Sequence, residues 1–335
     1  MGQYHGRAAI AIENAHIRVT VLEEGGHIAE IRHKATEVNP LWTPPWRSIE
    51  PSAWNRSKNP EYGDDAESKL LAGIMGHNLC LDLFGAPSYE EAAAGMTVHG
   101  EASVARYDIE ASNGSLRQRC VLAEAGLIFE RRIVLNGSMI AIDESVINVR
   151  SLDRAIAWTQ HVTIGPPFLE RGKTQLRAPA VKSYSLEGNP ERDWSSDEIR
   201  TYTNAEVSGG FTTHLMDEKR EKAYFLSYSP SSKILFGYVW RRSDFPWLGI
   251  WEENRSRKQP PWNGETLTWG LEFGASPLPE CRRKMIDRNR LGGAQTYRWV
   301  PARSEVRVRY CAFITAARSM PNNPDELSMI HSCDV

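Results

Sequence analysis

The chain has 335 residues, of which 41% are hydrophobic and 24% charged, so it carries enough apolar material for a globular core. The formal net charge is -2 and no block of Lys or Arg occurs, which argues against a nucleic-acid partner. No apolar stretch is long enough to span a bilayer, and no signal peptide is recognisable. We therefore expect a cytoplasmic protein with no membrane partner.

Extended segments begin near the N-terminus, with strands expected at residues 8–12, 16–22 and 28–33. The segment 39–65 is expected to be a long loop, and long loops in compact domains are usually functional or disordered. Its large side chains would suit a wall over a binding groove: Trp42, Trp46, Trp54 and Arg56. A short helix is expected at 66–73.

Two consecutive hairpins are the strongest local prediction. Alternating segments at 103–112 and 115–125 are separated by Asn113-Gly114, and segments at 127–135 and 138–149 meet at Asn136-Gly137. Asn-Gly between alternating segments is typical of a type I′ turn, which needs positive φ at both central residues. The region therefore predicts an antiparallel meander.

The rest of the chain continues in the same way, with strands expected at 155–164, 223–229, 233–241, 266–274 and 305–314. A helix is expected at 279–290, a second long loop at 171–203, and a peripheral tail after residue 319. Regular βαβ alternation is absent. The pattern predicts one mainly β, antiparallel domain over residues 1–335, with few short helices.

Several chemistries have no local support in this sequence. The five cysteines are odd in number, widely spaced and lack a CxxC pair, which argues against a disulfide framework or a structural zinc site. Dinucleotide-binding, Walker A, HExxH and GxSxG motifs are absent. We expect no cofactor and no metal, and look instead to His, Glu and Asp side chains that project from strands.

Glu272 is the first candidate. The strand at 266–274 alternates, so its large apolar side chains share the core face while Glu272 lies on the other face between Gly270 and Gly274. Glycine inside a strand often marks close approach by a ligand or another backbone. A solvent-facing Glu beside a bulge is the structural alternative.

Three histidines are the other candidates. His161 lies in a strand among small residues, His99 precedes Gly100-Glu101, and His77 follows Gly76. Imidazole titrates near neutrality and suits general acid–base catalysis. A lone histidine in a strand more often has a structural role, which is the alternative for each of them. A metal site formed by these histidines with a Glu is a further alternative, but no tight spacing supports it.

The order of these pieces resembles the galactose mutarotase (aldose 1-epimerase) superfamily. The matching segments are Val98-His99-Gly100, residues 129–135, Ser145-Val146-Ile147-Asn148, Gln160-His161-Val162 and Gly270-Leu271-Glu272-Phe273-Gly274. The resemblance covers roughly residues 8–317 and implies a β-supersandwich with its site in the concave face.

The resemblance also implies a mechanism without a cofactor. Glu272 would remove the proton of the anomeric hydroxyl, and His161 would protonate the ring oxygen, so that the sugar ring opens and recloses on the other face. His99 would orient the sugar and help to polarise the ring oxygen. Two departures stand out: His99-Gly100-Glu101 replaces the usual His-Gly-Gly, and the early arginine of the family has no match near Gly76-His77-Asn78.

The substrate contacts are therefore assigned from local pattern. Glu252 or Glu253 would grip sugar hydroxyls, Trp247, Trp251 and Trp262 are stacking candidates, and Arg255 or Arg257 could bind an acidic or phosphorylated sugar. The expected substrate-binding set is His77, Asn78, Trp251, Glu252, Trp247 and Arg56.

The leading hypothesis is an isomerase that interconverts sugar anomers, with a small-molecule carbohydrate as its partner and a monomeric or homodimeric state. A polysaccharide lyase or glycosidase on the same fold is one alternative, because fold does not fix function. A carbohydrate-binding protein without turnover is the other.

Overall fold

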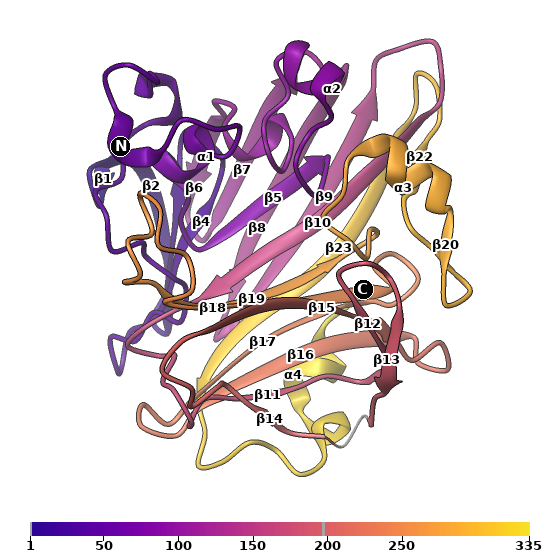
Figure 1. The fold of residues 1–335 in the computed structure, drawn as a ribbon. Helices are drawn as coiled ribbons and strands as arrows, with labels where there is room; N and C mark the ends of the chain where they lie inside the picture. Colours follow the sequence, from indigo (N-terminus) through magenta and orange to yellow (C-terminus); the bar gives the residue numbers. More distant parts are fainter. Residues whose placement is uncertain (1, 196–197) are drawn as a thin grey trace.

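The computed structural model describes residues 2–195 and 198–335, and two large antiparallel sheets dominate it (Figure 1). In spatial order the first sheet contains β1 (Gly2–Tyr4), β2 (Arg7–Glu13), β3 (Ile17–Leu22), β4 (Ile28–His33), β5 (His77–Asp82), β10 (Arg154–Ile164), β19 (Leu267–Gly274), β18 (Trp247–Asn254), β15 (Ser208–Met216), β12 (Ala180–Ser185) and β13 (Pro190–Asp193), and β22 (Arg298–Val300) pairs with β10. The second sheet contains β14 (Arg200–Thr201), β11 (Gln175–Arg177), β16 (Lys222–Ser229), β17 (Ile234–Arg241), β23 (Glu305–Ala316), β9 (Met139–Asn148), β8 (Leu127–Asn136), β7 (Ser115–Leu122) and β6 (Asp108–Ser112).

The remaining elements are short. They are the pair β20 (Arg290–Leu291) and β21 (Ala294–Gln295), the helices α1 (Ser68–Gly73), α2 (Tyr89–Ala93), α3 (Arg282–Arg288) and α4 (Ser328–Ser332), and the 3-10 turns η1 (Pro51–Ala53), η2 (Pro60–Tyr62), η3 (Glu101–Ser103) and η4 (Pro324–Glu326). No helix in the described part of the chain is long and apolar enough to cross a membrane.

The two sheets pack face to face over one apolar core. Phe273 of β19 contacts Tyr238 of β17 and Tyr310 of β23, with ring centroids 5.5 and 5.4 Å apart. The predicted core face of β19 is confirmed, because Trp269, Leu271 and Phe273 are all buried in this core. The mainly antiparallel β architecture predicted from the sequence is thus confirmed.

A buried polar cluster interrupts this apolar core. The Glu144 carboxylate pairs with Arg131 (2.7 Å) and accepts hydrogen bonds from Trp158 Nε1 (3.0 Å), Gln160 Nε2 (2.6 Å) and Tyr310 Oη (2.6 Å). A buried charge is tolerated only when it is paired and hydrogen-bonded. Glu144 therefore ties strands of both sheets to one point.

The predicted meander is confirmed as β6–β7–β8–β9, but its turns differ from the expected type. Gly114 has positive φ and Asn113 does not. The second turn is shifted by one residue, because Asn136 pairs with Met139 and leaves Gly137-Ser138 as the loop. Only the glycine of each Asn-Gly pair has a left-handed conformation, so neither turn is type I′.

Other expectations need correction. The segment 171–203 is not one long loop, since β11, β12, β13 and β14 lie within it. The tail after residue 319 is not peripheral: Ile330 and Cys333 are buried against the second sheet, and a disulfide joins Cys333 to Cys311. The cysteine count did not reveal this single bridge, because parity and spacing say nothing about one pair formed across 22 residues.

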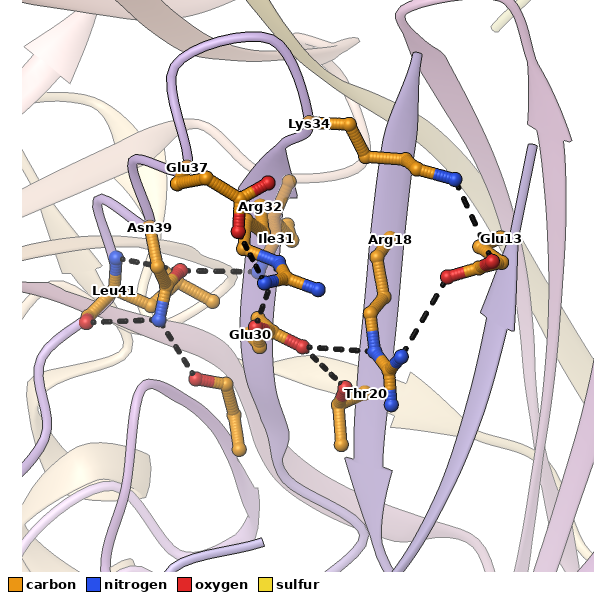
Figure 2. A network of polar contacts seen from close by, with 11 residues as sticks. Glu13, Arg18, Thr20, Glu30, Ile31, Arg32, Lys34, Glu37, Asn39 and Leu41 are labelled. Atoms are coloured by element: carbon orange, nitrogen blue, oxygen red, sulfur yellow. Dashed lines mark hydrogen bonds and ion pairs between the residues drawn. The ribbon is translucent and has the colours of Figure 1, made fainter. Parts of the chain in front are cut away.

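The start of the segment 39–65 is fixed to the first sheet (Figure 2). Asn39 Oδ1 accepts hydrogen bonds from Ile31 N (3.0 Å) and Leu41 N (3.2 Å), so it fastens the segment to β4. On the same strand, Glu30 accepts a 2.5 Å hydrogen bond from Thr20 and pairs with arginines on either side. This anchoring places Trp42 and Trp46 against Trp262.

We expect Glu144→Gln to lower the free energy of unfolding by about 3–5 kcal/mol, because it leaves Arg131 buried without a counter-ion. Denaturant unfolding measures this change. The control is Glu130→Gln, which breaks an exposed pair with Arg119 and should cost under about 1 kcal/mol. Equal losses in the two variants would contradict the role given to the buried cluster.

Candidate active site

The first sheet brings two candidate residues into direct contact. β10 pairs with β19 so that His161 lies opposite Glu272, and both side chains leave the same face of the sheet. His161 Nε2 and Glu272 Oε1 are 3.1 Å apart, and His161 Nδ1 bonds Thr163 Oγ1 at 3.0 Å. The contact joins a possible proton donor and a possible proton acceptor without any intervening group.

His99 reaches the same place from a loop. Its backbone has φ +65°, its carbonyl accepts a hydrogen bond from Leu81 N (3.1 Å), and its Nδ1 donates to Phe84 O (2.7 Å). The His99 and His161 ring centroids are 5.0 Å apart. The structure thus brings His99, His161 and Glu272 together, although they are far apart in the sequence.

The glycines around Glu272 have a specific packing reason. A Cβ at Gly270 would lie 2.5 Å from Glu272 Oε1, and a Cβ at Gly274 would lie 2.4 Å from Thr159 Oγ1. The expected close approach is therefore real at both positions: a side-chain oxygen occupies the space at Gly270, and both the backbone and the side chain of Thr159 occupy it at Gly274. Gly270 makes room for the carboxylate.

A cavity of about 580 Å³ opens above these three residues. This volume lies within the usual range of about 300–1,000 Å³ for small-molecule sites. Trp251 and Trp262 also line it, and the Trp251 ring centroid is 5.9 Å from that of His161. In the described part of the chain, no group of three or more His, Cys, Asp or Glu residues could hold a metal ion.

Burial sets the protonation of the three groups. It raises the pKa of Glu272 to about 8, because a carboxylate loses hydration there. It lowers the pKa of His99 to about 4 and that of His161 well below its usual value, with the neighbouring histidines adding to the effect at His161. At neutral pH the cavity therefore contains a protonated carboxyl and two neutral imidazoles.

The acidic pair at the end of β18 differs from the expectation. Glu252 contributes to the cavity lining, but strand alternation turns its side chain to the other face of the sheet, where Oε1 accepts a hydrogen bond from Ser208 Oγ at 2.5 Å. Glu253 points to the cavity face, and its carboxylate accepts hydrogen bonds from Ser256 N and Oγ, both at 2.6 Å.

Three expected substrate contacts lie elsewhere. His77 is fully buried between the sheets, bonded to Gln160 Oε1 (2.9 Å) and Tyr238 Oη (3.0 Å). Trp247 is also fully buried, with Nε1 donating to Gln295 O. Arg56 is an exposed partner of Asp64. None of the three lines the cavity. One step of strand alternation turns His77 to the core, whereas Trp247 is on the same face of β18 as Trp251 but four residues further along the strand. Arg56 lies in an exposed loop.

Asn78 lies beside the central pair. It pairs with His161 across β5 and β10, so their side chains share a face, and it is 1% exposed. Neither its Oδ1 nor its Nδ2 has a hydrogen-bond partner among the described residues. A buried amide without partners is rare and calls for an explanation.

Arg257, a candidate for binding an acidic sugar, has its positive charge balanced by neighbouring carboxylates. Its guanidinium pairs with Glu67 (3.3 Å) and Glu253 (3.7 Å), and it lies over the rings of Trp262 and Trp251 at 4.7 and 5.3 Å. A phosphate or carboxylate in the cavity would meet more negative than positive charge.

Glu67, Phe84 and Phe211 also line the cavity and were not predicted from the sequence. Glu67 and Phe84 lie in connections whose path cannot be read from periodicity. Phe211 lies in β15, which the sequence analysis did not identify as a strand, since two glycines obscure its alternation.

No protein-family model and no curated protein sequence matches the chain. Solved structures do match it. A protein of Klebsiella pneumoniae, assigned as an aldose 1-epimerase, has a TM-score of 0.65 and 13% identity over 90% of this chain and 77% of that one. A galactose mutarotase related enzyme of Lactobacillus acidophilus has a TM-score of 0.65 and 11% identity over 93% of this chain and 99% of that one. A galactose mutarotase-like protein of Lactobacillus casei has a TM-score of 0.59 and 15% identity over 92% of this chain and 100% of that one. The chain therefore has the galactose mutarotase-like fold, as predicted.

The raised pKa of Glu272 predicts a pH dependence of stability. The pKa of Glu272 is about 8 in the folded protein and that of an unfolded Glu is about 4.3. The free energy of unfolding is therefore highest below about pH 4.3 as far as this group is concerned, and it falls as pH rises from about 4.3 towards 8. We expect Glu272→Gln to remove this loss, which amounts to a few kcal/mol. Denaturant unfolding at pH 5 and pH 8 tests it, and parallel behaviour of the two proteins would contradict the assignment.

Proposed function

We propose that the protein interconverts the anomers of an aldose, with Glu272 and His161 as its base and acid. The observation that carries the proposal is the 3.1 Å contact between these two groups at the floor of a cavity that also contains His99. The fold shared with galactose mutarotase-like structures supports it as an analogy.

The 3.1 Å distance between His161 Nε2 and Glu272 Oε1 suits anomer exchange. The anomeric hydroxyl and the ring oxygen are bonded to the same carbon, so the group that deprotonates one and the group that protonates the other must lie close together. Glu272 takes the hydroxyl proton while His161 donates a proton to the ring oxygen, and the C1–O5 bond breaks. Rotation about C1–C2 then exposes the other face of the aldehyde, and the two proton transfers run in reverse as the ring closes.

One shared proton is enough for this cycle. Before a sugar binds, the proton lies on Glu272, because burial disfavours both charged forms. Transfer across the hydrogen bond to His161 Nε2 produces the carboxylate base and the imidazolium acid together. The pair therefore acts as a unit, and its apparent pKa belongs to both groups.

His99 fits an orienting role. Since its Nδ1 donates to Phe84 O and its pKa is low, the ring is neutral and its Nε2 is an acceptor. It can bind a sugar hydroxyl, whereas polarising the ring oxygen would require a donor. Asn78 offers both a donor and an acceptor beside His161.

The alternatives are less well supported. A glycosidase needs two carboxylates flanking the scissile bond, and Glu67 and Glu253, on the cavity wall with Glu272, are engaged with Arg257 and Ser256. A lyase needs a cation to neutralise a uronate, and Arg257 is already paired. A binding protein without turnover has no need of the acid–base contact.

We expect Glu272→Gln to reduce anomer exchange by about 100- to 10,000-fold, because the amide cannot accept the proton. Magnetisation-transfer NMR on a panel of aldoses measures the exchange. Glu130→Gln, which changes an exposed carboxylate outside the cavity, is the matched control and should keep full activity. Undiminished exchange in Glu272→Gln would rule out Glu272 as the base, and no exchange by the unmodified protein would refute the proposal.

The shared proton also predicts the pH profile of kcat/KM. Above about 8 the pair loses its proton and with it the acid, so kcat/KM should fall as pH rises through this value. Below neutrality the profile should stay flat until a second proton adds to the pair. An increase through pH 8, after correction for the uncatalysed rate, would instead indicate a lone carboxylate base with a neutral His161.

A further inference from the structure

The lining of the cavity changes in chemistry from one part to another. Polar and charged side chains come from residues 65–67 and from the end of β18 and the turn that follows it, namely Asp65, Glu67, Glu253, Ser256 and Arg257. Apolar side chains come from the segment after β5, from β15, from the β12–β13 connection and from the segment after β19, namely Phe84, Ala86, Leu186, Phe211 and Pro279, and Ile74, Val98, Trp251 and Trp262 also belong to the lining. Aromatic rings can stack on the C–H faces of any pyranose, but an aliphatic side chain such as Leu186 offers no partner to a hydroxyl.

Phe211 brings this apolar surface next to the proposed base. A Cβ at Gly249 would lie 2.9 Å from two ring atoms of Phe211 and 3.4 Å from Glu272 Cβ, so the Phe211 ring lies over Gly249 beside Glu272. The Phe84 ring centroid is 6.2 Å from that of Phe211 and 6.2 Å from that of His99. The two aromatic rings thus span the distance between Glu272 and His99.

Leu186 extends the surface towards solvent. It lies in the connection between β12 and β13, lines the cavity and is 48% exposed. A single exposed leucine needs no explanation, but this one lines the same cavity as Phe211. A sugar hydroxyl placed against the Phe211 ring, deeper in the cavity, would lose hydration without gaining a hydrogen bond from that ring, which costs about 1–3 kcal/mol in proteins.

We infer that the substrate is an uncharged aldose carrying an apolar substituent, of which a deoxygenated carbon is the simplest case. The substituent lies against Phe211 and Leu186, while the hydroxylated edge faces the polar lining. This inference rests on the proposed anomer exchange and specifies its substrate. Arg257 already pairs with Glu67 and Glu253, which disfavours an anionic group as the recognised feature.

The test compares each parent hexose with its deoxy analogues: D-galactose and D-glucose against their 2-deoxy and 6-deoxy forms. Apolar pockets discriminate against an added hydroxyl only moderately, by up to about 100-fold. We expect at least one deoxy sugar to exchange with kcat/KM about 10-fold above its parent. Leu186→Ser and Phe211→Ser should each bring that ratio towards one. Leu152→Ser is the control, since Leu152 is 77% exposed and outside the cavity lining.

A binding measurement separates this inference from the proposed function. Saturation-transfer difference NMR with 6-deoxygalactose should show contact at the methyl group that Leu186→Ser and Phe211→Ser remove. Exchange of parent and deoxy sugars at equal kcat/KM would overturn the inference and leave the proposed function intact. Methyl contact that depends on Leu186 and Phe211, without exchange of any sugar, would overturn the proposed function and support the inference.

Discussion

The pairing of β10 with its neighbours is the constraint on which the site depends. Alternate residues of this buried strand face different environments: Gln160 joins the Glu144 cluster between the sheets, and His161, the next residue, faces the cavity. A slip of one residue would exchange the two faces. It would place an imidazole beside a buried carboxylate and an amide in the cavity. The hydrogen bonds of Glu144 to Trp158 and Gln160 disfavour that slip, so the core cluster also fixes the register of the site.

Burial also controls the protonation of Glu272 and His161. The carboxyl and the imidazole lie on neighbouring strands of a sheet whose other face is the core, and the loop residue His99 packs against His161. Loss of hydration then disfavours charge on both groups, which leaves one proton for two bases. The same loss of hydration destabilises the folded protein at high pH. Loss of hydration thus causes both the acid–base behaviour of the pair and the lower stability of the folded protein at high pH.

The sequence predicted the parts of the fold that periodicity and turns encode. Alternation and glycine turns located β6 to β9, β10 and β19, and the glycines around Glu272 indicated a crowded position. β5, β15 and β18 were missed, because β5 is buried on both faces and glycines or aromatic runs obscure alternation in the other two. Since Phe211 lies on one of these strands, its place in the cavity lining could not be anticipated.

Long-range contacts were beyond the sequence for a related reason. The family resemblance suggested His99, His161 and Glu272, yet no local pattern shows that a loop residue with positive φ meets two strands. Glu252 and Trp247 were assigned from the local pattern, and one step of strand alternation separated the expectation from the structure in the first case. Tertiary pairing, which sequence spacing does not report, decided these positions.

The most direct test of the account is a crystal structure of Glu272→Gln soaked with an aldose, since the variant should bind the sugar without turning it over. The account predicts the anomeric hydroxyl within hydrogen-bond distance of residue 272 and the ring oxygen within reach of His161 Nε2. A sugar bound in the cavity with its anomeric carbon remote from both residues would contradict the proposed acid–base pair.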